Sequence, residues 1–479
     1  MKLLGLGLMG AVLLGAKSEA RADERCFLPG ARLPGRCGTV SVPLRHDAPD
    51  AGRIEVYYAV QPAFERWRRA PDPVFFLAGG PGQSAVQVAP VILQSLAQAR
   101  LTRDIVFIDQ RGTGRSAPLA CDVDAVDQTL EVGAFVEAMT RCVGQLKHDV
   151  REFTTAAFVE DLEAVRKALG YEKVNLYGGS YGTRVAQAYL RAHPDRVRSA
   201  VLDGVAPMGM RVGLEMGADA QPSLDALFAA CADEPACKKS FPELPTRFDE
   251  LLKALRAEPR RLTLVEPMTG APLTLEVTAD MVAGLVRFLL YSPQTRRLVP
   301  VAIAEARAGR LETLMRLGLA ASAGQQGSMS LGLLFSVLCA EDLAGRGPKD
   351  IGSVERASFV GPAIAEAFLA VCEKWPSPRQ PADLRPLVTK VPMLLLSGRL
   401  DPVTPPARAE QLRRHLERAA HVVVPEGGHI VGGLGCLPEL MADFFENPDP
   451  SALDSACVEN VERPAFFTSL QGPDGEVRK

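Results

Sequence analysis

The chain has 479 residues, of which 47% are hydrophobic and 23% are charged, and its formal net charge is −3. So many apolar residues exclude an intrinsically disordered chain, and the near balance of charge gives no basis for binding nucleic acid or an anionic membrane surface. The length allows a large core and either several domains or one elaborated domain. We therefore expect a globular protein that acts on a small, roughly neutral substrate.

The N-terminus has the layout of an export signal. Lys2 precedes an apolar run over residues 3–16, and small residues then end in Ala-Arg-Ala at residues 20–22. This pattern is typical of a secretory signal peptide, and the apolar run is too short to span a membrane as a helix. We predict that residues 1–22 are removed and that the mature protein is secreted or periplasmic, with no stable insertion in the membrane.

Ten cysteines agree with export, because an oxidising compartment is where an even, dispersed set can be held as disulfides. They fall into neighbouring couples, so we favour pairing between neighbours, although spacing alone does not decide connectivity. The sequence has no Cys-x-x-Cys and no spacing typical of metal ligands, and we expect neither a metal nor another cofactor. The expected pairs are Cys26–Cys37, Cys121–Cys142, Cys231–Cys237, Cys339–Cys372 and Cys436–Cys457.

Short apolar runs that end at turn residues predict strands buried on both faces of a sheet. Stretches with helical spacing of apolar residues, at 157–169 and 184–192, alternate with some of these strands. Such alternation predicts an α/β fold with a mostly parallel, doubly wound sheet. In chain order the expected strands are residues 54–60, 73–78, 104–109, 173–177, 199–203, 391–397 and 421–424.

The strand pattern stops after residue 203 and resumes only near residue 391. We interpret residues 207–384 as a helical lid inserted into a sheet domain that is made of residues 23–206 and 385–479. Within the lid we expect helices at residues 221–232, 248–257, 279–290 and 299–308, and a hairpin at residues 262–277.

The sharpest chemical signal is Gly-Gly-Ser-Tyr-Gly at residues 178–182, between a predicted strand and a predicted helix. In this context G-x-S-x-G is a nucleophile elbow, because the small residues beside Ser180 permit a tight turn that exposes its hydroxyl. The amides at the start of the helix point at developing negative charge. An ordinary glycine turn is the alternative, and the two flanking elements favour Ser180 as a nucleophile.

A serine nucleophile needs a histidine base, which in this arrangement follows both the serine and the acid in the chain. His429 lies in a Glu-Gly-Gly-His loop after the strand at 421–424, at the edge of the sheet where it would reach Ser180. A surface histidine without a role is the alternative. The other histidines precede Ser180, end a helix, belong to a charged helix or open a strand: His46, His148, His193, His415 and His421.

The acid that orients the histidine is expected on a loop at the carboxyl end of a strand. Asp401, in Asp-Pro-Val-Thr-Pro at residues 401–405, follows the strand at 391–397 and lies between the serine and the histidine in the chain. Asp203, at the end of an earlier strand, is the rival. We prefer Asp401 because prolines rigidify its loop, whereas Asp203 before a glycine is typical of a turn cap.

The oxyanion of such a reaction needs two preorganised amides. Leu-Ala-Gly-Gly-Pro-Gly at residues 77–82 follows an early strand, so we expect the amide of Gly80, or of its neighbour Gly79, to act together with that of Tyr181. A nucleotide-binding loop is excluded because a proline follows the two glycines and no Lys-Ser or Lys-Thr comes after them.

A further turn at residues 109–116, Asp-Gln-Arg-Gly-Thr-Gly-Arg-Ser, makes the pattern specific, and we expect Arg111 to brace the oxyanion loop. The motifs that combine are residues 79–82, 109–116, 178–182, 401–405 and 427–429. Together they resemble the proline iminopeptidase and tripeptidyl aminopeptidase family of α/β-hydrolases, the TAP-like serine peptidases. They extend from about residue 70 to 435 without most of the lid. One departure is Ala78, where iminopeptidases usually carry histidine.

The resemblance implies an α/β-hydrolase that cleaves peptides near an unblocked N-terminus through an acyl-enzyme, as a prolyl or tripeptidyl aminopeptidase does. The signal peptide and the cysteines resemble the exported tripeptidyl branch. The resemblance also implies that lid carboxylates hold the substrate's α-amino group, with Glu341 in Cys-Ala-Glu-Asp as the first candidate and a solvated helix end as its alternative. The competing functions are a carboxylesterase or lipase-like hydrolase with the same triad and a noncatalytic binding protein. The sequence does not indicate an oligomeric state.

Overall fold

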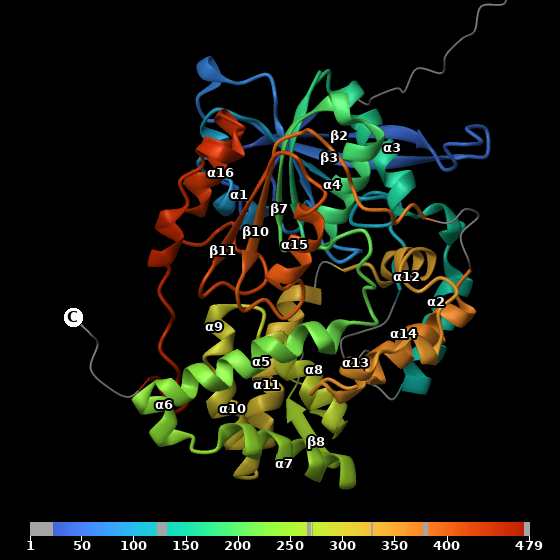
Figure 1. The fold of residues 1–479 in the computed structure, drawn as a ribbon. Helices are drawn as coiled ribbons and strands as arrows, with labels where there is room; N and C mark the ends of the chain where they lie inside the picture. The colour runs from blue at the N-terminus through green and yellow to red at the C-terminus, as the bar shows by residue number, and fades with distance from the viewer. Residues whose placement is uncertain are drawn as a thin grey trace, which may run out of the picture.

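The computed structural model describes residues 23–121, 132–265, 270, 272–326, 329–376 and 382–473, so the predicted signal peptide lies outside the described residues. A nine-stranded sheet runs through the molecule in the order β1-β2-β3-β5-β4-β6-β7-β10-β11 (Figure 1). In this order the strands β1, β2, β3 and β5 pair antiparallel with one another. From β5 through β4, β6, β7 and β10 to β11, each strand is parallel to the next. The strands are β1 (Glu24–Cys26), β2 (Gly35–Pro43), β3 (Arg53–Gln61), β4 (Val74–Leu77), β5 (Ile105–Ile108), β6 (Val174–Gly179), β7 (Val197–Asp203), β10 (Met393–Gly398) and β11 (Ala419–Val424).

The mostly parallel sheet predicted from the sequence is thus confirmed, and each of the predicted strands is present within two residues of its expected ends. The inner strands β4 and β5 are buried at every position, as strands covered on both faces must be. Successive side chains point to opposite faces, so Phe75 belongs to the apolar core under α3 and α4, and Phe76 to the core under α1 and α16. These helices are α3 (Thr155–Ala168), α4 (Tyr181–Ala192), α1 (Ala89–Ser95) and α16 (Leu437–Glu446).

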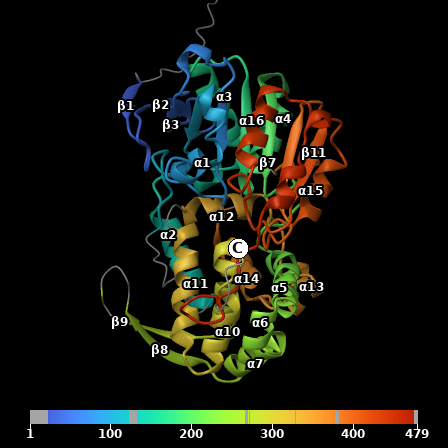
Figure 2. The same cartoon turned by 90° about the vertical axis from the view of Figure 1, so that its left-hand side faces the viewer.

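Helices inserted between β7 and β10 cover one end of the sheet (Figures 1 and 2). Those from α5 to α11, with the β8–β9 hairpin, enclose an apolar core of their own, whereas α12 and α14 share the core of the α3–α4 side together with α2 (Val132–Gln145). The inserted elements are α5 (Met216–Asp233), α6 (Pro235–Ser240), α7 (Leu244–Ala257), β8 (Arg260–Val265), β9 (Pro272–Val277), α8 (Ala279–Leu289), α9 (Pro293–Arg296), α10 (Val299–Arg307), α11 (Leu311–Gln326), α12 (Leu331–Ala340), α13 (Ser353–Ala357) and α14 (Ala363–Lys374).

The predicted domain boundaries at residues 206 and 384 fall in the connections that lead from β7 to α5 and from α14 to β10. After α16 the chain crosses back to the lid, where Phe466 is buried in the lid core. The lid is therefore joined to the sheet domain at its two chain connections and also through the C-terminal segment.

Five disulfides pair each cysteine with the neighbour expected from the sequence. Two of them lie within the lid, where Cys231–Cys237 joins α5 to α6 and Cys339–Cys372 joins α12 to α14. Cross-links of this kind stabilise a fold mainly by restricting the unfolded chain. Within the described residues, no helix combines the length and the apolar character needed to cross a membrane.

Candidate active site

Ser180 lies alone between the end of β6 and the start of α4. Its backbone angles, φ 54° and ψ −123°, are strained for a residue with a side chain, which is typical of a nucleophile elbow. The turn can close so tightly because glycines lie two residues before and two residues after Ser180: a methyl group on Gly178 would lie 2.6 Å from the carbonyl oxygen of Gly182, and one on Gly182 would overlap the carbonyl of Leu77. Sequence and geometry together present the hydroxyl at the N-terminus of α4.

His429 and Asp401 form a pair in which the carboxylate is fully buried and the imidazole is 7% exposed. Asp401 Oδ2 lies 2.9 Å from His429 Nδ1, and Oδ1 lies 3.1 Å from the same nitrogen. The carboxylate also accepts hydrogen bonds from the amides of Val403 and Thr404, at 2.7 and 3.0 Å. Burial disfavours the charged form, but the nearby His429 and these hydrogen bonds outweigh it, so the pKa of Asp401 lies below its ordinary value. Asp401 therefore stays ionised beside the imidazole.

The His429 loop lies over the ends of β6 and β7, next to the elbow. A methyl group on Gly204, which follows β7, would lie 3.2 Å from His429 Cε1. The amide of Ser180 donates to the carbonyl oxygen of Asp203, the residue before Gly204, at 2.9 Å. The structure thus brings Ser180, His429 and Asp401, whose roles are predicted from the sequence, to one edge of the sheet.

Asp203, the rival acid, holds the backbone of the histidine loop. Its completely buried carboxylate accepts the amides of Val431 and Gly432, at 2.9 and 2.7 Å, and the hydroxyl of Tyr177 at 3.0 Å. Burial raises its pKa above the ordinary value. Of the two aspartates, Asp401 is the one hydrogen-bonded to His429, which favours the preferred assignment.

The glycine loop after β4 lies directly against the elbow. A methyl group on Gly79 would lie 3.2 Å from Ser180 Cβ, and Gly80 has a φ of 105° that favours glycine. The amide of Gly79 donates to Gln83 Oε1 at 3.3 Å, which favours Gly80 as the donor to an oxyanion. Tyr181 supplies the other expected amide from the first position of α4.

Asp109, rather than Arg111, braces this loop. Asp109 Oδ1 accepts the hydroxyl of Ser84 at 2.7 Å and the amide of Val86 at 3.1 Å, directly after the oxyanion glycines. The expected role of Arg111 is wrong: its buried guanidinium binds both carboxylate oxygens of Asp161 on α3, at 2.6 Å each, and backbone carbonyls at the end of β2. The two side chains leave the turn in different directions, which the sequence alone does not reveal.

Residues 72–255 match the sequence family described as alpha/beta hydrolase fold, and residues 357–457 match the family described as TAP-like protein. The chain is a TAP-like α/β-hydrolase. The family resemblance seen in the sequence motifs is thereby confirmed.

Three curated relatives of this TAP-like hydrolase differ in how much of the chain they match. The serine protease Hip1 of Mycobacterium tuberculosis is 28% identical over 450 residues, which cover 83% of this chain and 84% of the relative. The proline iminopeptidase of Neisseria meningitidis is 35% identical over 133 residues, or 28% of this chain and 32% of that protein. The tripeptidyl aminopeptidase of Streptomyces coelicolor is 30% identical over 192 residues, or 36% and 35%.

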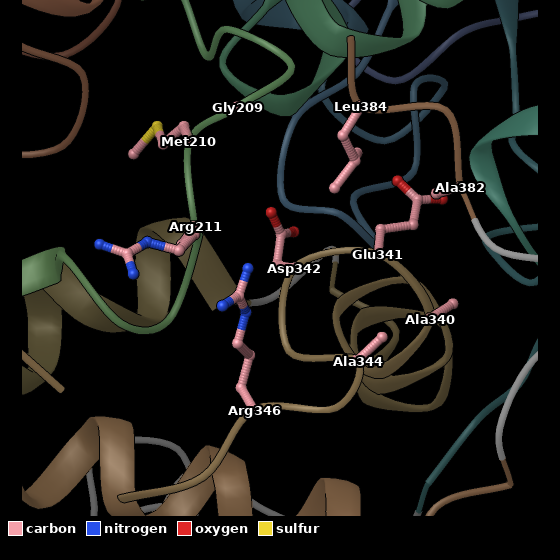
Figure 3. A pocket seen from close by; sticks show the side chains of 10 residues that line it. All are labelled: Gly209, Met210, Arg211, Ala340, Glu341, Asp342, Ala344, Arg346, Ala382 and Leu384. Atoms are coloured by element: carbon pink, nitrogen blue, oxygen red, sulfur yellow. The ribbon is translucent and has the colours of Figure 1, made fainter. Parts of the chain in front are cut away.

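Glu341 of the TAP-like hydrolase lies at the end of α12 and lines a cavity of about 600 Å³ together with Asp342, Arg211 and Arg346 (Figure 3). Its two carboxylate oxygens accept the amide and the hydroxyl of Thr155, at 2.9 and 2.8 Å. Burial raises the pKa of Glu341 to about 7. Its predicted binding of a substrate amine stays a prediction.

Asp342 faces the guanidinium of Arg184 on α4. Both of its oxygens accept hydrogen bonds from Arg184 Nη1, at 2.7 and 2.8 Å. Thr155 Oγ1 in turn lies 2.6 Å from the hydroxyl of Tyr181. The two lid carboxylates are therefore linked to the first turn of the helix that follows Ser180.

Lid residues also reach the oxyanion loop, which the sequence did not indicate. The amide of Ser330 donates to the Gly82 carbonyl at 2.8 Å, and a methyl group on Gly80 would lie 3.0 Å from Met329 Cε. Met329 thus covers the loop on the side of the lid.

Thr404 is a further residue that sequence reasoning missed. Its buried hydroxyl donates to Asp401 Oδ2 at 2.8 Å and lies 3.3 Å from His429 Nδ1. The sequence feature that could have identified Thr404 is a hydroxyl residue three positions after an aspartate, since that spacing lets the side chain turn back onto the carboxylate.

Replacing Thr404 by valine is expected to lower kcat about tenfold, because a hydrogen bond to a charged group is worth about 1.5 kcal/mol. The measurement is kcat and KM for a chromogenic ester, with Thr404→Ser as the control that keeps the hydroxyl and the rate. A valine variant with wild-type kcat would show that the hydroxyl does not hold the acid.

A second serine, histidine and carboxylate are joined by hydrogen bonds at β10 and β11. His421 Nε2 is 3.0 Å from Ser397 Oγ, and His421 Nδ1 is 2.6 Å from Glu410 Oε1. Ser397 lies inside β10 and is completely buried, so no substrate reaches its hydroxyl. This arrangement supplies a matched control for Ser180.

Proposed function

We propose that this TAP-like hydrolase is an exported serine aminopeptidase that cleaves peptides near a free N-terminus. The observation that carries the proposal is the strained Ser180 beside the hydrogen-bonded pair of His429 and Asp401. The proposal draws further support from the relatives, which are named as a serine protease, a proline iminopeptidase and a tripeptidyl aminopeptidase.

In the proposed reaction His429 Nε2 takes the Ser180 proton as the hydroxyl oxygen attacks the scissile carbonyl. Asp401 holds the imidazole in the tautomer with the proton on Nδ1 and stabilises the imidazolium that forms. The amides of Gly80 and Tyr181 stabilise the oxyanion. Collapse transfers the proton from His429 to the leaving amine and leaves an acyl-enzyme, which water then hydrolyses with His429 as the base.

Export is part of the proposal. It draws support from the signal-like residues 1–22 and from the pairing of ten cysteines in five disulfides, which persist in oxidising compartments. We infer a secreted or periplasmic protein.

Recognition of the free amine is assigned to the cavity that Glu341 lines. An ammonium group paired with a buried carboxylate would be held far better than a neutral or acylated end. The raised pKa of Glu341 sets a pH window: the carboxyl is neutral below pH about 7 and charged above it. A peptide amine loses its proton above pH about 7.7 to 8.0.

We therefore expect the KM for free-amine peptides to rise as the pH falls below about 7 and again as it rises above about 8. The measurement is the pH dependence of KM for prolyl, alanyl, dipeptidyl and tripeptidyl fluorogenic amides, free and N-acetylated, beside a p-nitrophenyl ester. Acetylation is expected to abolish amide cleavage, and the chain length that turns over fastest names the number of residues released.

Glu341→Gln is the variant for this test, because an amide side chain can keep both contacts with Thr155. It is expected to raise the KM for free-amine peptides about 10- to 100-fold, because the variant loses a charge-assisted hydrogen bond to the substrate amine. The KM for the ester is expected to change far less. Glu366→Gln, at an exposed lid carboxylate, is the control. If acetylated and free peptides are cleaved equally, or only the ester is cleaved, the aminopeptidase assignment is wrong and an esterase is the better assignment.

A further inference from the structure

The turn between α8 and α10 in the lid lies against the histidine loop. The amide of His429 donates to the carbonyl oxygen of Tyr291 at 2.7 Å, and the two rings meet edge to face with their centres 5.3 Å apart. A methyl group on Gly428 would overlap the Tyr291 carbonyl. The backbone at His429 is thus set by a lid residue.

The same part of the lid also holds the acid loop. The carbonyl of Leu400, the residue directly before Asp401, accepts the hydroxyl of Ser223 on α5 at 2.7 Å and a hydrogen bond from Arg296 Nη2 on α9. The amide of Leu400 donates to the carbonyl of Gly427 at 3.0 Å, which ties the acid loop to the histidine loop. Two donors from the lid therefore bind the same carbonyl oxygen, in the peptide bond that joins Leu400 to Asp401.

Burying the charged side chain of Arg296 at this position costs free energy. It is only 5% exposed, and burial lowers its pKa to about 10. Its Nη2 also donates to the Leu290 carbonyl at 2.9 Å, while its buried Nε has no hydrogen-bond partner among the described residues. Removing a guanidinium from water is costly, and the carbonyls together with the nearby charges of Glu426 and Asp401 offset that cost only in part. An apolar side chain would fill this space at lower cost, so packing does not account for the arginine.

We propose that Arg296 is a positioning residue that acts on catalysis through the Leu400 carbonyl. It fixes the backbone before Asp401, so that the carboxylate faces His429 Nδ1, and the triad is held in line only when the lid lies on the sheet domain. The inference rests on the proposed function, because it assigns Arg296 to the same serine, histidine and aspartate.

The test compares full-length mature variants in three assays. Arg296→Met removes the donors and keeps an apolar stem, Arg296→Lys keeps a cation that can donate, and Ser223→Ala removes the other donor to Leu400. Arg297→Met is the matched control: it lies next in the same turn, with its guanidinium 4.6 Å from the ring centre of Phe467. The assays are the rate at which a fluorophosphonate modifies Ser180, kcat and KM for a p-nitrophenyl ester, and the downfield proton resonance of His429 Nδ1–H, assigned with His429→Ala.

Arg296→Met is expected to lower the modification rate and kcat about 10- to 100-fold, because a small misplacement of a catalytic group has an effect of this size. The KM is expected to change little. The downfield resonance is expected to weaken or shift, Arg296→Lys to recover part of each signal, and Arg297→Met to behave as the wild type. If Arg296→Met keeps the wild-type modification rate and resonance and loses only thermal stability, the proposal is overturned. If that variant does not fold, Ser223→Ala decides: a weaker change in the same direction supports the proposal, and none overturns it.

The assays also separate this inference from the proposed function. The resonance and the fluorophosphonate need no peptide substrate, so they read the effect of Arg296 even if no peptide is cleaved. A wild-type protein that the fluorophosphonate does not modify refutes serine catalysis, while the resonance still shows whether Arg296 orients Asp401.

Discussion

Replacing Ser180 by alanine is expected to lower hydrolysis of every substrate by roughly 10⁴- to 10⁶-fold, because the variant loses the hydroxyl of the proposed nucleophile. Alanine keeps the β-carbon, so the strained turn at φ 54° is no less tolerable than in the wild type. The fold should be retained, and the amides of Gly80 and Tyr181 leave a small residual rate. The measurement is kcat/KM for a peptide amide and an ester, with thermal unfolding to verify the fold.

Ser397→Ala is the control for this result, because Ser397 is also hydrogen-bonded to a histidine that bonds a carboxylate. Burial of Ser397 inside β10 predicts that its loss leaves turnover and fluorophosphonate labelling close to the wild-type level. Labelling that persists in Ser180→Ala and disappears in Ser397→Ala would mean that the nucleophile has been assigned to the wrong serine.

Replacing Asp401 by asparagine is expected to lower kcat by roughly 10⁴-fold. An asparagine presents an amide that favours the wrong imidazole tautomer, and it cannot stabilise the imidazolium. The amides of Val403 and Thr404 would still bond its oxygen, so the loop should keep its shape. The measurement is kcat across pH: some activity should return at high pH, where solvent base can replace His429.

Asp203→Asn tests the rival acid. Asp203 bonds the backbone amides of Val431 and Gly432 rather than the imidazole, so its loss is expected to lower stability and to reduce kcat much less than Asp401→Asn does. A larger loss of kcat in Asp203→Asn than in Asp401→Asn would reverse the assignment of the acid.

Much of the fold could be predicted because its elements carry local patterns. The all-apolar strands β4 and β5, and the switch from strand to helix around Ser180, are patterns of a few consecutive residues. The strand β2 was missed, since half-buried polar residues interrupt its buried positions and since it contains Gly35 and Gly38, which weaken the strand signal.

The lid was predicted only as a run of helices with one hairpin, which the structure contains as β8 and β9. Its division into a separate core around α5 to α11, and a part with α12 and α14 that packs on the sheet domain beside α2, depends on which apolar faces meet. Helical periodicity shows that a helix has an apolar face, and it does not show what covers that face.

By itself the sequence determined most strands of the parallel sheet, the elbow at Ser180 and the glycine loop at Gly80, and it favoured neighbour pairing of the cysteines, because each depends on residues close together in the chain. Only the tertiary structure decided that Asp401 rather than Asp203 bonds His429, that Asp109 rather than Arg111 braces the oxyanion loop, and that Arg296 of the lid reaches Leu400. These contacts join segments distant in sequence. Which of two similar side chains meets a given partner depends on the packing of the whole sheet and lid, and no local pattern records that.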